Sequence, residues 1–288
     1  MAAERAAAAA GREDPLLNWT RPEREECLLC MLPLPLNETE TCYRNCCGKT
    51  VCYGCIYDQF QVDKKEGRRT LDVLSCIICP FCRSEDSDLD VLNHEMKLAN
   101  AGNHYALWRI GQLHFKGRQG LRQDMKKGIQ WWHRAAEAGS SSALTDLGVC
   151  YREGYGVAQN WVSALEYFQK AADMGNWKGF LMIGSLLLQQ GSWEEGFLNL
   201  RKAVMCGYSA KDMFDNLRNG YRLGYITKEE FAFTLRENMK ANNEMKSESR
   251  DIVRKKLEEE GRRTFTPSAD SAKNHKKGKK KGKKKGRK

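Results

Sequence analysis

The chain has 288 residues, of which 41% are hydrophobic, and a formal net charge of +11. This length allows one large domain or two smaller domains with tails, and the hydrophobic content is sufficient for a packed core. A membrane-spanning helix needs about 18 or more consecutive apolar residues. The sequence has no such run, so it predicts no membrane span.

The basic excess lies entirely at the C-terminus. Residues 273–288 contain ten Lys, one Arg and no acidic residue, and the other 37 basic residues equal the 37 acidic residues in number. Attraction to nucleic acid or to an acidic membrane would therefore depend on this tail alone. We expect residues 261–288 to be disordered, because a Lys/Gly-rich segment cannot bury a core. The tail could make weak polyanion contacts, act as a nuclear address or only keep the chain soluble.

The N-terminal residues 1–22 have low complexity and no hydrophobic periodicity, so we expect them to be disordered. Residues 1–11 lack the apolar core of a signal peptide, which favours a reducing compartment, cytoplasmic or nuclear. Ten of the twelve cysteines fall between Cys27 and Cys82. In such a compartment, clustered cysteines bind metal more often than they form disulfides.

The cysteine-rich block spans residues 23–86 and holds four close cysteine pairs: Cys27/Cys30, Cys46/Cys47, Cys52/Cys55 and Cys79/Cys82. Zinc binds four thiolate or imidazole ligands in a tetrahedron, and a Cys-x-x-Cys turn supplies two of them. The block therefore has enough ligands for two zinc ions. Few apolar residues accompany the cysteines, and a domain this small needs a metal or disulfide staple. The competing interpretation is a set of buried or redox-active dithiols.

Three runs in this block resemble the RING finger family: Cys27-Leu28-Leu29-Cys30, Cys47-Gly48-Lys49-Thr50-Val51-Cys52-Tyr53-Gly54-Cys55 and Cys79-Pro80-Phe81-Cys82-Arg83. The resemblance implies an interleaved arrangement, or cross-brace. One zinc would be bound by Cys27, Cys30, Cys52 and Cys55, and the other by Cys46, Cys47, Cys79 and Cys82. No histidine occurs between the first and last of these cysteines, which makes this an all-cysteine variant. Two assignments stay open, because Cys42 could replace Cys46 and Cys76 could pair with Cys79.

The resemblance also implies a partner, because RING fingers commonly bind a ubiquitin-conjugating enzyme. The matching contact positions here are Leu29, Phe60 or Tyr57, Pro80 and Arg83. In such ligases the basic residue after the last ligand, here Arg83, bridges the enzyme and ubiquitin. Catalysis would then be positioning, with no covalent step on a RING side chain, so we predict no catalytic residue. The competing interpretation leaves Leu29 and Phe60 in the core and Arg83 as a solvated cation.

Residues 87–226 show a period of about 36 residues. One series of glycines follows probable helix ends, at Gly102, Gly139, Gly175 and Gly207, and a second series lies at Gly111, Gly148 and Gly184. A fixed period of this size predicts an α-solenoid of antiparallel helix pairs, with small residues at close helix crossings and left-handed glycine caps. The third unit, from Gly184 to Ala203, is four residues shorter in its loop than the second.

The best-formed units resemble Sel-one-like repeats, which are relatives of tetratricopeptide repeats. The matching runs are 106–111 with 131–139, and 143–151 with 154–157 and 167–175. The resemblance implies helix pairs that recruit a protein partner. Most repeat aromatics are expected in the core, and the single histidines His104, His114 and His133 are given no metal or catalytic role. The expected fold class is mainly α, a solenoid of Sel-one-like helix pairs preceded by a small zinc-bound α+β RING domain.

After the repeats, the pattern predicts a helix over 209–219 and a turn over 220–224. A capping box, Thr227-Lys-Glu-Glu230, then starts a polar helix over 227–260. Its early apolar residues can cover the end of the solenoid, whereas beyond Glu244 we expect it to project into water. The whole pattern predicts a ubiquitin ligase that recruits a conjugating enzyme through the RING and a protein substrate through the repeats. The alternative is a non-enzymatic zinc-binding adaptor.

Overall fold

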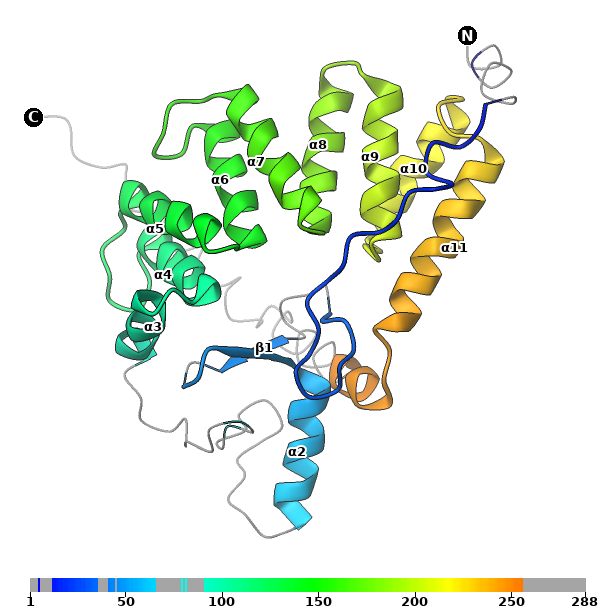
Figure 1. The fold of residues 1–288 in the computed structure, drawn as a ribbon. Helices are drawn as coiled ribbons and strands as arrows, with labels where there is room; N and C mark the ends of the chain where they lie inside the picture. Colours follow the sequence, from blue (N-terminus) through cyan, green and yellow to red (C-terminus); the bar gives the residue numbers. More distant parts are fainter. Residues whose placement is uncertain are drawn as a thin grey trace, which may run out of the picture.

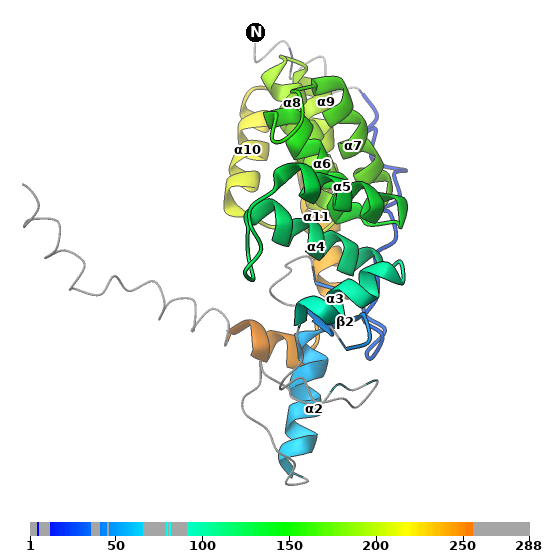
Figure 2. The same ribbon diagram turned by 90° about the vertical axis from the view of Figure 1, so that its left-hand side faces the viewer.

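The computed structural model describes residues 5, 12–35, 41–44, 46–65, 79, 81 and 91–255. Within these ranges the chain forms a two-stranded hairpin, helix α2 and a long series of further helices. Figure 1 shows the later helices as a curved row, with the hairpin and α2 below it. In the view turned by 90°, α2 again extends away from the row (Figure 2). None of the described helices combines the length and the apolar character that crossing a bilayer requires.

The repeat region consists of helices α3 Val91–Asn100, α4 His104–Lys116, α5 Met125–Glu137, α6 Ser141–Glu153, α7 Trp161–Asp173, α8 Trp177–Gln189 and α9 Trp193–Met205. Helix α4 packs on α5, α6 on α7, and α8 on α9, and successive pairs are stacked against each other. The prediction of a mainly α solenoid built from helix pairs is therefore confirmed.

The glycine series have the structural roles that their spacing predicts. Gly148 lies where α6 crosses α7, and a Cβ atom at this position would stand 2.5 Å from the Phe168 ring. Gly139 has a φ of +91°, a left-handed conformation that ends its repeat. Glycine adopts this conformation without the steric cost that a Cβ atom would add. The connection between α8 and α9 covers residues 190–192, whereas that between α6 and α7 covers 154–160. The four-residue shortening of the third unit is therefore confirmed.

The buried residues of the solenoid form three clusters along the helix pairs, which contain several aromatic side chains. Trp132 is 2% exposed and Phe168 is fully buried, as expected for repeat positions. Trp161 and Trp193 differ, because each begins a helix and remains more than 40% exposed. These two side chains lie on the outer face instead of in the core.

The first correction concerns residues 12–22, which we call the N-terminal strap. We expected residues 1–22 to be disordered, but the strap lies along the solenoid (Figure 1). Leu16 is 1% exposed, and Trp19 packs edge-on against Phe180 with ring centroids 5.8 Å apart. Two apolar anchors suffice to bind an otherwise polar segment, and composition averaged over 22 residues does not reveal them.

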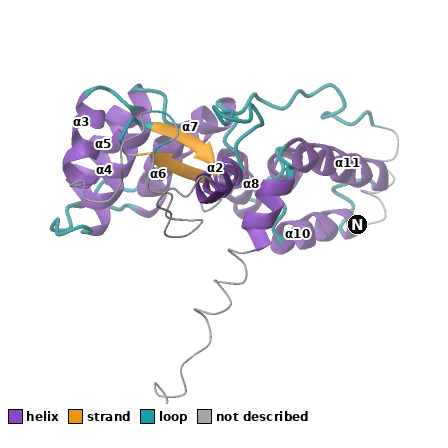
Figure 3. Ribbon diagram, turned by 90° about the horizontal axis from the view of Figure 1, so that it is seen from below, coloured by secondary structure: helices purple, strands orange, loops and turns teal. Residues whose placement is uncertain are grey.

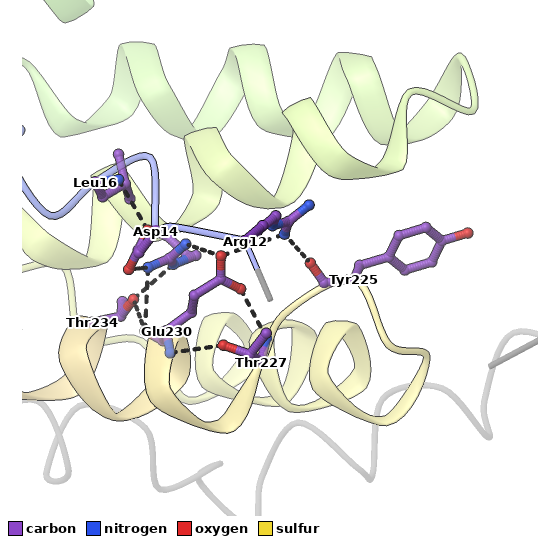
Figure 4. A network of polar contacts seen from close by, with 8 residues as sticks. Arg12, Asp14, Leu16, Tyr225, Thr227, Glu230 and Thr234 are labelled. Carbon is purple, nitrogen blue, oxygen red and sulfur yellow. Dashed lines mark hydrogen bonds and ion pairs between the residues drawn. The ribbon is translucent and has the colours of Figure 1, made fainter. Parts of the chain in front are cut away.

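A polar network fixes the start of the strap (Figure 4). Asp14 forms an ion pair with Arg201 of α9, whose side chain is 3% exposed. Arg201 also lies 3.5 Å from Glu230 and donates to the Thr234 hydroxyl at 2.9 Å. Arg12 reaches the same Glu230 carboxylate at 3.4 Å. The strap therefore supplies one of the two carboxylates that neutralise a buried arginine.

The second correction concerns the C-terminal region, where α10 Lys211–Arg222 and α11 Lys228–Glu244 follow the repeats. The predicted turn starts three residues too early, because residues 220–222 stay helical and Gly220 lies where α10 packs closely on Phe197. The capping box is confirmed, since the Glu230 amide donates to the Thr227 hydroxyl at 3.1 Å and the Thr227 amide to the Glu230 carboxylate at 2.8 Å.

The polar helix does not continue to residue 260 in one piece. It ends at Glu244, and residues 248–255 form a separate helical segment that returns toward the hairpin and α2 (Figures 1 and 2). We call residues 248–255 the C-terminal segment. Arg250 is 2% exposed and Val253 is 1% exposed, so this part is buried where we expected it to be solvated. The Lys-rich tail, 273–288, lies outside the described residues.

Candidate metal centre

The hairpin brings the cysteine pairs toward one another. Strand β1, Thr41–Arg44, pairs antiparallel with β2, Lys49–Cys52, and Cys42 lies opposite Val51. Cys46 and Cys47 lie in the tight turn between the strands. Strand β2 runs directly into α2, Tyr53–Lys65, so Cys52 ends the strand and Cys55 lies in the first turn of the helix.

The first cysteine group consists of Cys27, Cys30, Cys52 and Cys55, whose sulfur atoms all lie within 4.8 Å of one another. Cys27 Sγ lies 3.8 Å from Cys55 Sγ, and Cys52 Sγ lies 3.6 Å from Cys55 Sγ and 3.9 Å from Cys30 Sγ. Zn–S bonds of about 2.3 Å in a regular tetrahedron place the sulfurs about 3.8 Å apart. The donor set and its spacing therefore fit a tetrathiolate zinc site.

The second cysteine group consists of Cys46, Cys47 and Cys79, again with all sulfurs within 4.8 Å. Cys47 Sγ lies 3.7 Å from Cys79 Sγ. Among the described cysteines, the structure brings Cys46 into this group, whereas the Cys42 sulfur accepts a hydrogen bond from Arg44 at 3.9 Å. The predicted fourth ligand, Cys82, and the alternative Cys76 lie outside the described residues. Both groups could hold a metal ion.

In the first group the surroundings favour the thiolate of Cys27 and disfavour those of Cys52 and Cys55. Hydrogen bonds with the Cys52 and Cys55 thiols hold the pKa of Cys27 far below its usual range. The same contacts raise the pKa of Cys55. In the second group, burial and the Cys79 thiol raise the pKa of Cys47 to about 11. Thiolates are the metal-binding form of cysteine, so a bound divalent cation would be needed to displace the remaining protons at neutral pH.

The surface beside the first group is apolar. Leu29, between the first two ligands, is 42% exposed, and its neighbours Leu28 and Met31 are more exposed still. Phe60 and Tyr57 on α2 are half-buried. The structure therefore places Leu29 at the surface and not in the core, and Phe60 between the two environments. Pro80 and Arg83 lie outside the described residues, so this part of the predicted partner site has no structural description.

The hairpin is held against the repeats by a small set of specific contacts. Tyr43 stacks on Tyr105 of α4 with ring centroids 4.2 Å apart, and its hydroxyl donates to Asn103 at 3.1 Å. The Asn103 side chain in turn donates to the Gly48 carbonyl at 3.1 Å. In the view from below the hairpin lies beside the row of helices (Figure 3), whereas α2 points away from the row (Figures 1 and 2). The cysteine groups therefore have a fixed place relative to the repeats.

A groove of about 330 Å³ opens between the hairpin side and the repeats. Its walls come from residues 23–25, from the loop at Leu34, and from the starts of helices α4, α6 and α8, with Tyr105, Ser142 and Trp177 among the lining residues. The groove combines apolar rings with polar groups, as ligand-binding pockets do. Both the repeats and the hairpin region therefore contribute walls to this groove.

The Sel1 repeat family model matches residues 104–140 and 141–176. Residues 104–176 are two Sel1 repeats. The matched ranges correspond to the pairs α4/α5 and α6/α7, which confirms the two best units expected from the sequence. No RING family model matches the cysteine-rich block.

Two curated relatives come from Arabidopsis thaliana. The ERAD-associated E3 ubiquitin-protein ligase component HRD3B is 35% identical over 106 residues, which are 36% of this chain and 16% of the plant protein. Component HRD3A is 34% identical over 72 residues, 25% of this chain and 10% of that protein. The similarity thus spans less than a fifth of either relative. Among solved structures, the Sel1 repeat protein from Oxalobacter formigenes aligns with a TM-score of 0.44 and 23% identity, over 55% of this chain and 66% of that protein.

Sequence reasoning missed one residue at the metal centre. Arg250 of the C-terminal segment donates to Cys30 Sγ at 3.2 Å, although 220 residues separate the two in the chain. The local sequence around Arg250 is that of a solvated helix, since most of its neighbours are charged or polar. The sequence signals were Ile252 and Val253, two apolar residues in a stretch that we expected to face water, and Val253 is buried.

Proposed function

We propose that residues 23–86 form a RING-type domain that binds two zinc ions. One observation carries the proposal, namely that the two cysteine groups interleave along the chain. The first group consists of the pairs Cys27/Cys30 and Cys52/Cys55. In the second group, Cys46 and Cys47 lie between those two pairs in the sequence, and Cys79 follows both. A set of independent dithiols would instead pair neighbours in sequence. Zinc at each site would tie together segments that the small apolar cluster around Val51 and Ile56 holds only weakly.

On this basis we propose that the protein is a ubiquitin ligase in which the Sel1 repeats recruit a protein substrate. The exposed Leu29 beside the first group offers an apolar contact for a conjugating enzyme. The plant relatives bear the name of E3 ligase components, which supports a ubiquitin-related role for proteins with similar segments. The contacts through Tyr43 and Asn103 hold the two functional regions at a fixed distance. Catalysis would consist in positioning the thioester near a lysine of the substrate.

The test is a ubiquitination assay on the zinc-loaded full chain with a panel of conjugating enzymes. We expect ubiquitin chains with at least one of them, and a loss of about tenfold or more in rate for Leu29→Ala and for Arg83→Ala. Leu223→Ala is the matched control, because Leu223 is 44% exposed on the far end of the solenoid and Leu29 is 42% exposed. Absence of ubiquitin chains with every enzyme would refute the ligase function.

The second candidate is a non-enzymatic scaffold with the same two zinc sites. The observation that favours it is the match of residues 104–176 to Sel1 repeats, which would bind a protein partner without any conjugating enzyme. A scaffold would bind its partner through the repeats with full affinity and show no activity with any conjugating enzyme. Affinity capture of conjugating enzymes by the wild type and by Leu29→Ala distinguishes a ligase from a scaffold. A ligase captures a conjugating enzyme and loses it on this substitution, whereas a scaffold captures none in either form.

A further inference from the structure

Arg250 is buried against the loop that carries the first cysteine group. Arg250 belongs to the C-terminal segment and is 2% exposed. Besides its 3.2 Å contact with Cys30 Sγ, the guanidinium donates to the carbonyl of Pro33 at 2.7 Å and to that of Leu32 at 3.4 Å. A further bond of 2.9 Å goes to the Met245 carbonyl at the turn before the segment. The same side chain therefore holds both the ligand loop and its own segment.

The charge of this guanidinium needs a partner. Its hydrogen-bond partners are neutral carbonyls and the sulfur atoms of Cys30 and Cys52, and no carboxylate within the described part of the chain forms an ion pair with it. A cation removed from water is costly unless an anion compensates it. Four thiolates around one divalent zinc carry a net charge of −2. The tetrathiolate is thus the anion that the buried Arg250 lacks.

The packing at Gly54 shows that the segment fits the ligand-bearing turn closely. Gly54 lies between Cys52 and Cys55 at the start of α2, and a Cβ atom there would stand 2.7 Å from Arg250 Cγ and 2.9 Å from its backbone nitrogen. The backbone of the C-terminal segment therefore rests directly on the turn that supplies two ligands. Any other residue at position 54 would push the segment away from the site.

We propose that Arg250 is the counter-cation of the first cysteine group, so that metal binding by Cys27, Cys30, Cys52 and Cys55 and docking of the C-terminal segment stabilise each other. The inference rests on the proposed zinc sites. Arg250 acts as a positioning residue, because its bonds to the sulfur and to the carbonyls after Cys30 orient a ligand without replacing one. Since coupling between two events is reciprocal, loss of either one weakens the other. The C-terminal segment, residues 248–255, is then held firmly beside the metal centre only when the metal is bound.

The experiment measures zinc release from the full chain to a coloured chelator, and in parallel trypsin cleavage within 246–255. We expect Arg250→Met to release one of two zinc ions about 10–100 times more readily, the range typical of partners that orient metal ligands. Arg250→Lys keeps the positive charge but loses the planar guanidinium, so its rate of zinc release should lie between those of Arg250→Met and the wild type. Arg254→Met is the matched control, since Arg254 is on the same segment, with its side chain 39% exposed, and pairs with Asp251. In the wild type, removal of zinc should expose the segment to trypsin.

Two results would overturn the inference. The first is wild-type zinc retention in Arg250→Met, even if its C-terminal segment becomes sensitive to trypsin, because Arg250 would then be only a mechanical anchor. The second is an undisturbed segment in the zinc-free wild type. Gly54→Ala provides an independent check with Arg250 intact, and it should mimic Arg250→Met in zinc release. Zinc content of the wild type separately tests the proposed function, so that a metal-free wild type refutes the sites themselves and not only the coupling.

Discussion

The N-terminal strap should contribute measurably to stability through one side chain. Leu16 is 1% exposed, and its replacement by alanine removes three buried carbon atoms. At about 0.8 kcal/mol for each buried carbon, the transfer contribution alone is about 2.4 kcal/mol. An unfilled cavity adds to it, so we expect a loss of about 2–4 kcal/mol for Leu16→Ala. In a helical array of this size each kcal/mol lowers the melting temperature by roughly 2–4 °C.

The assay combines thermal unfolding with limited trypsin cleavage after Arg12, since the bond after Arg21 precedes Pro22 and resists trypsin. If the strap undocks before the solenoid unfolds, the lost stability of Leu16→Ala appears as faster cleavage. A loss of about 3 kcal/mol in the free energy of docking raises the undocked population roughly a hundredfold. Leu17→Ala is the matched control, since the adjacent Leu17 is 54% exposed and its replacement should change stability by less than about 0.5 kcal/mol. Equal melting temperatures and equal cleavage rates for the two variants would refute the described packing of the strap.

Four further outcomes are expected. Gly148→Ala places a methyl group 2.5 Å from the Phe168 ring, and urea unfolding should show a loss of about 1–3 kcal/mol. Thr227→Ala removes the hydroxyl that accepts from the Glu230 amide at 3.1 Å, and the same measurement should show a loss of about 1 kcal/mol. Burial raises the pKa of Cys150 to about 12 and that of Cys206 to about 11, so alkylation at pH 8 should modify them only after unfolding, and their rapid modification in the folded protein would contradict this. Deletion of 273–288 removes the whole formal excess of +11, and retention on heparin should disappear at low salt.

The repeat region could be predicted from the sequence because its determinants recur. Gly111, Gly148 and Gly184 occupy the same place in successive units, and each is needed for a close helix crossing. Repetition converts a weak local signal into a strong one. The interleaving of the cysteine groups was expected only through the resemblance to RING fingers, because the spacing of the Cys-x-x-Cys pairs indicates zinc ligands but does not say which pairs share an ion.

The strap and the C-terminal segment could not be predicted in the same way. Asp14 and Arg250 each owe their burial to a partner about 190–220 residues away in sequence, Arg201 and Cys30 respectively. Neither segment has enough apolar residues to show a hydrophobic face by itself. Their order arises from tertiary contacts that satisfy single charges, and local composition carries no record of such contacts.

The most direct test of the central claim, two zinc ions in interleaved cysteine groups, is native mass spectrometry of the full chain with single Cys→Ser variants. The account predicts two zinc ions in the wild type and in Cys42→Ser, and one in Cys30→Ser and in Cys46→Ser. A wild type that folds without zinc would contradict the claim. So would a loss of one ion in Cys42→Ser while Cys46→Ser keeps both, because the second site would then take a ligand from strand β1 and not from the hairpin turn.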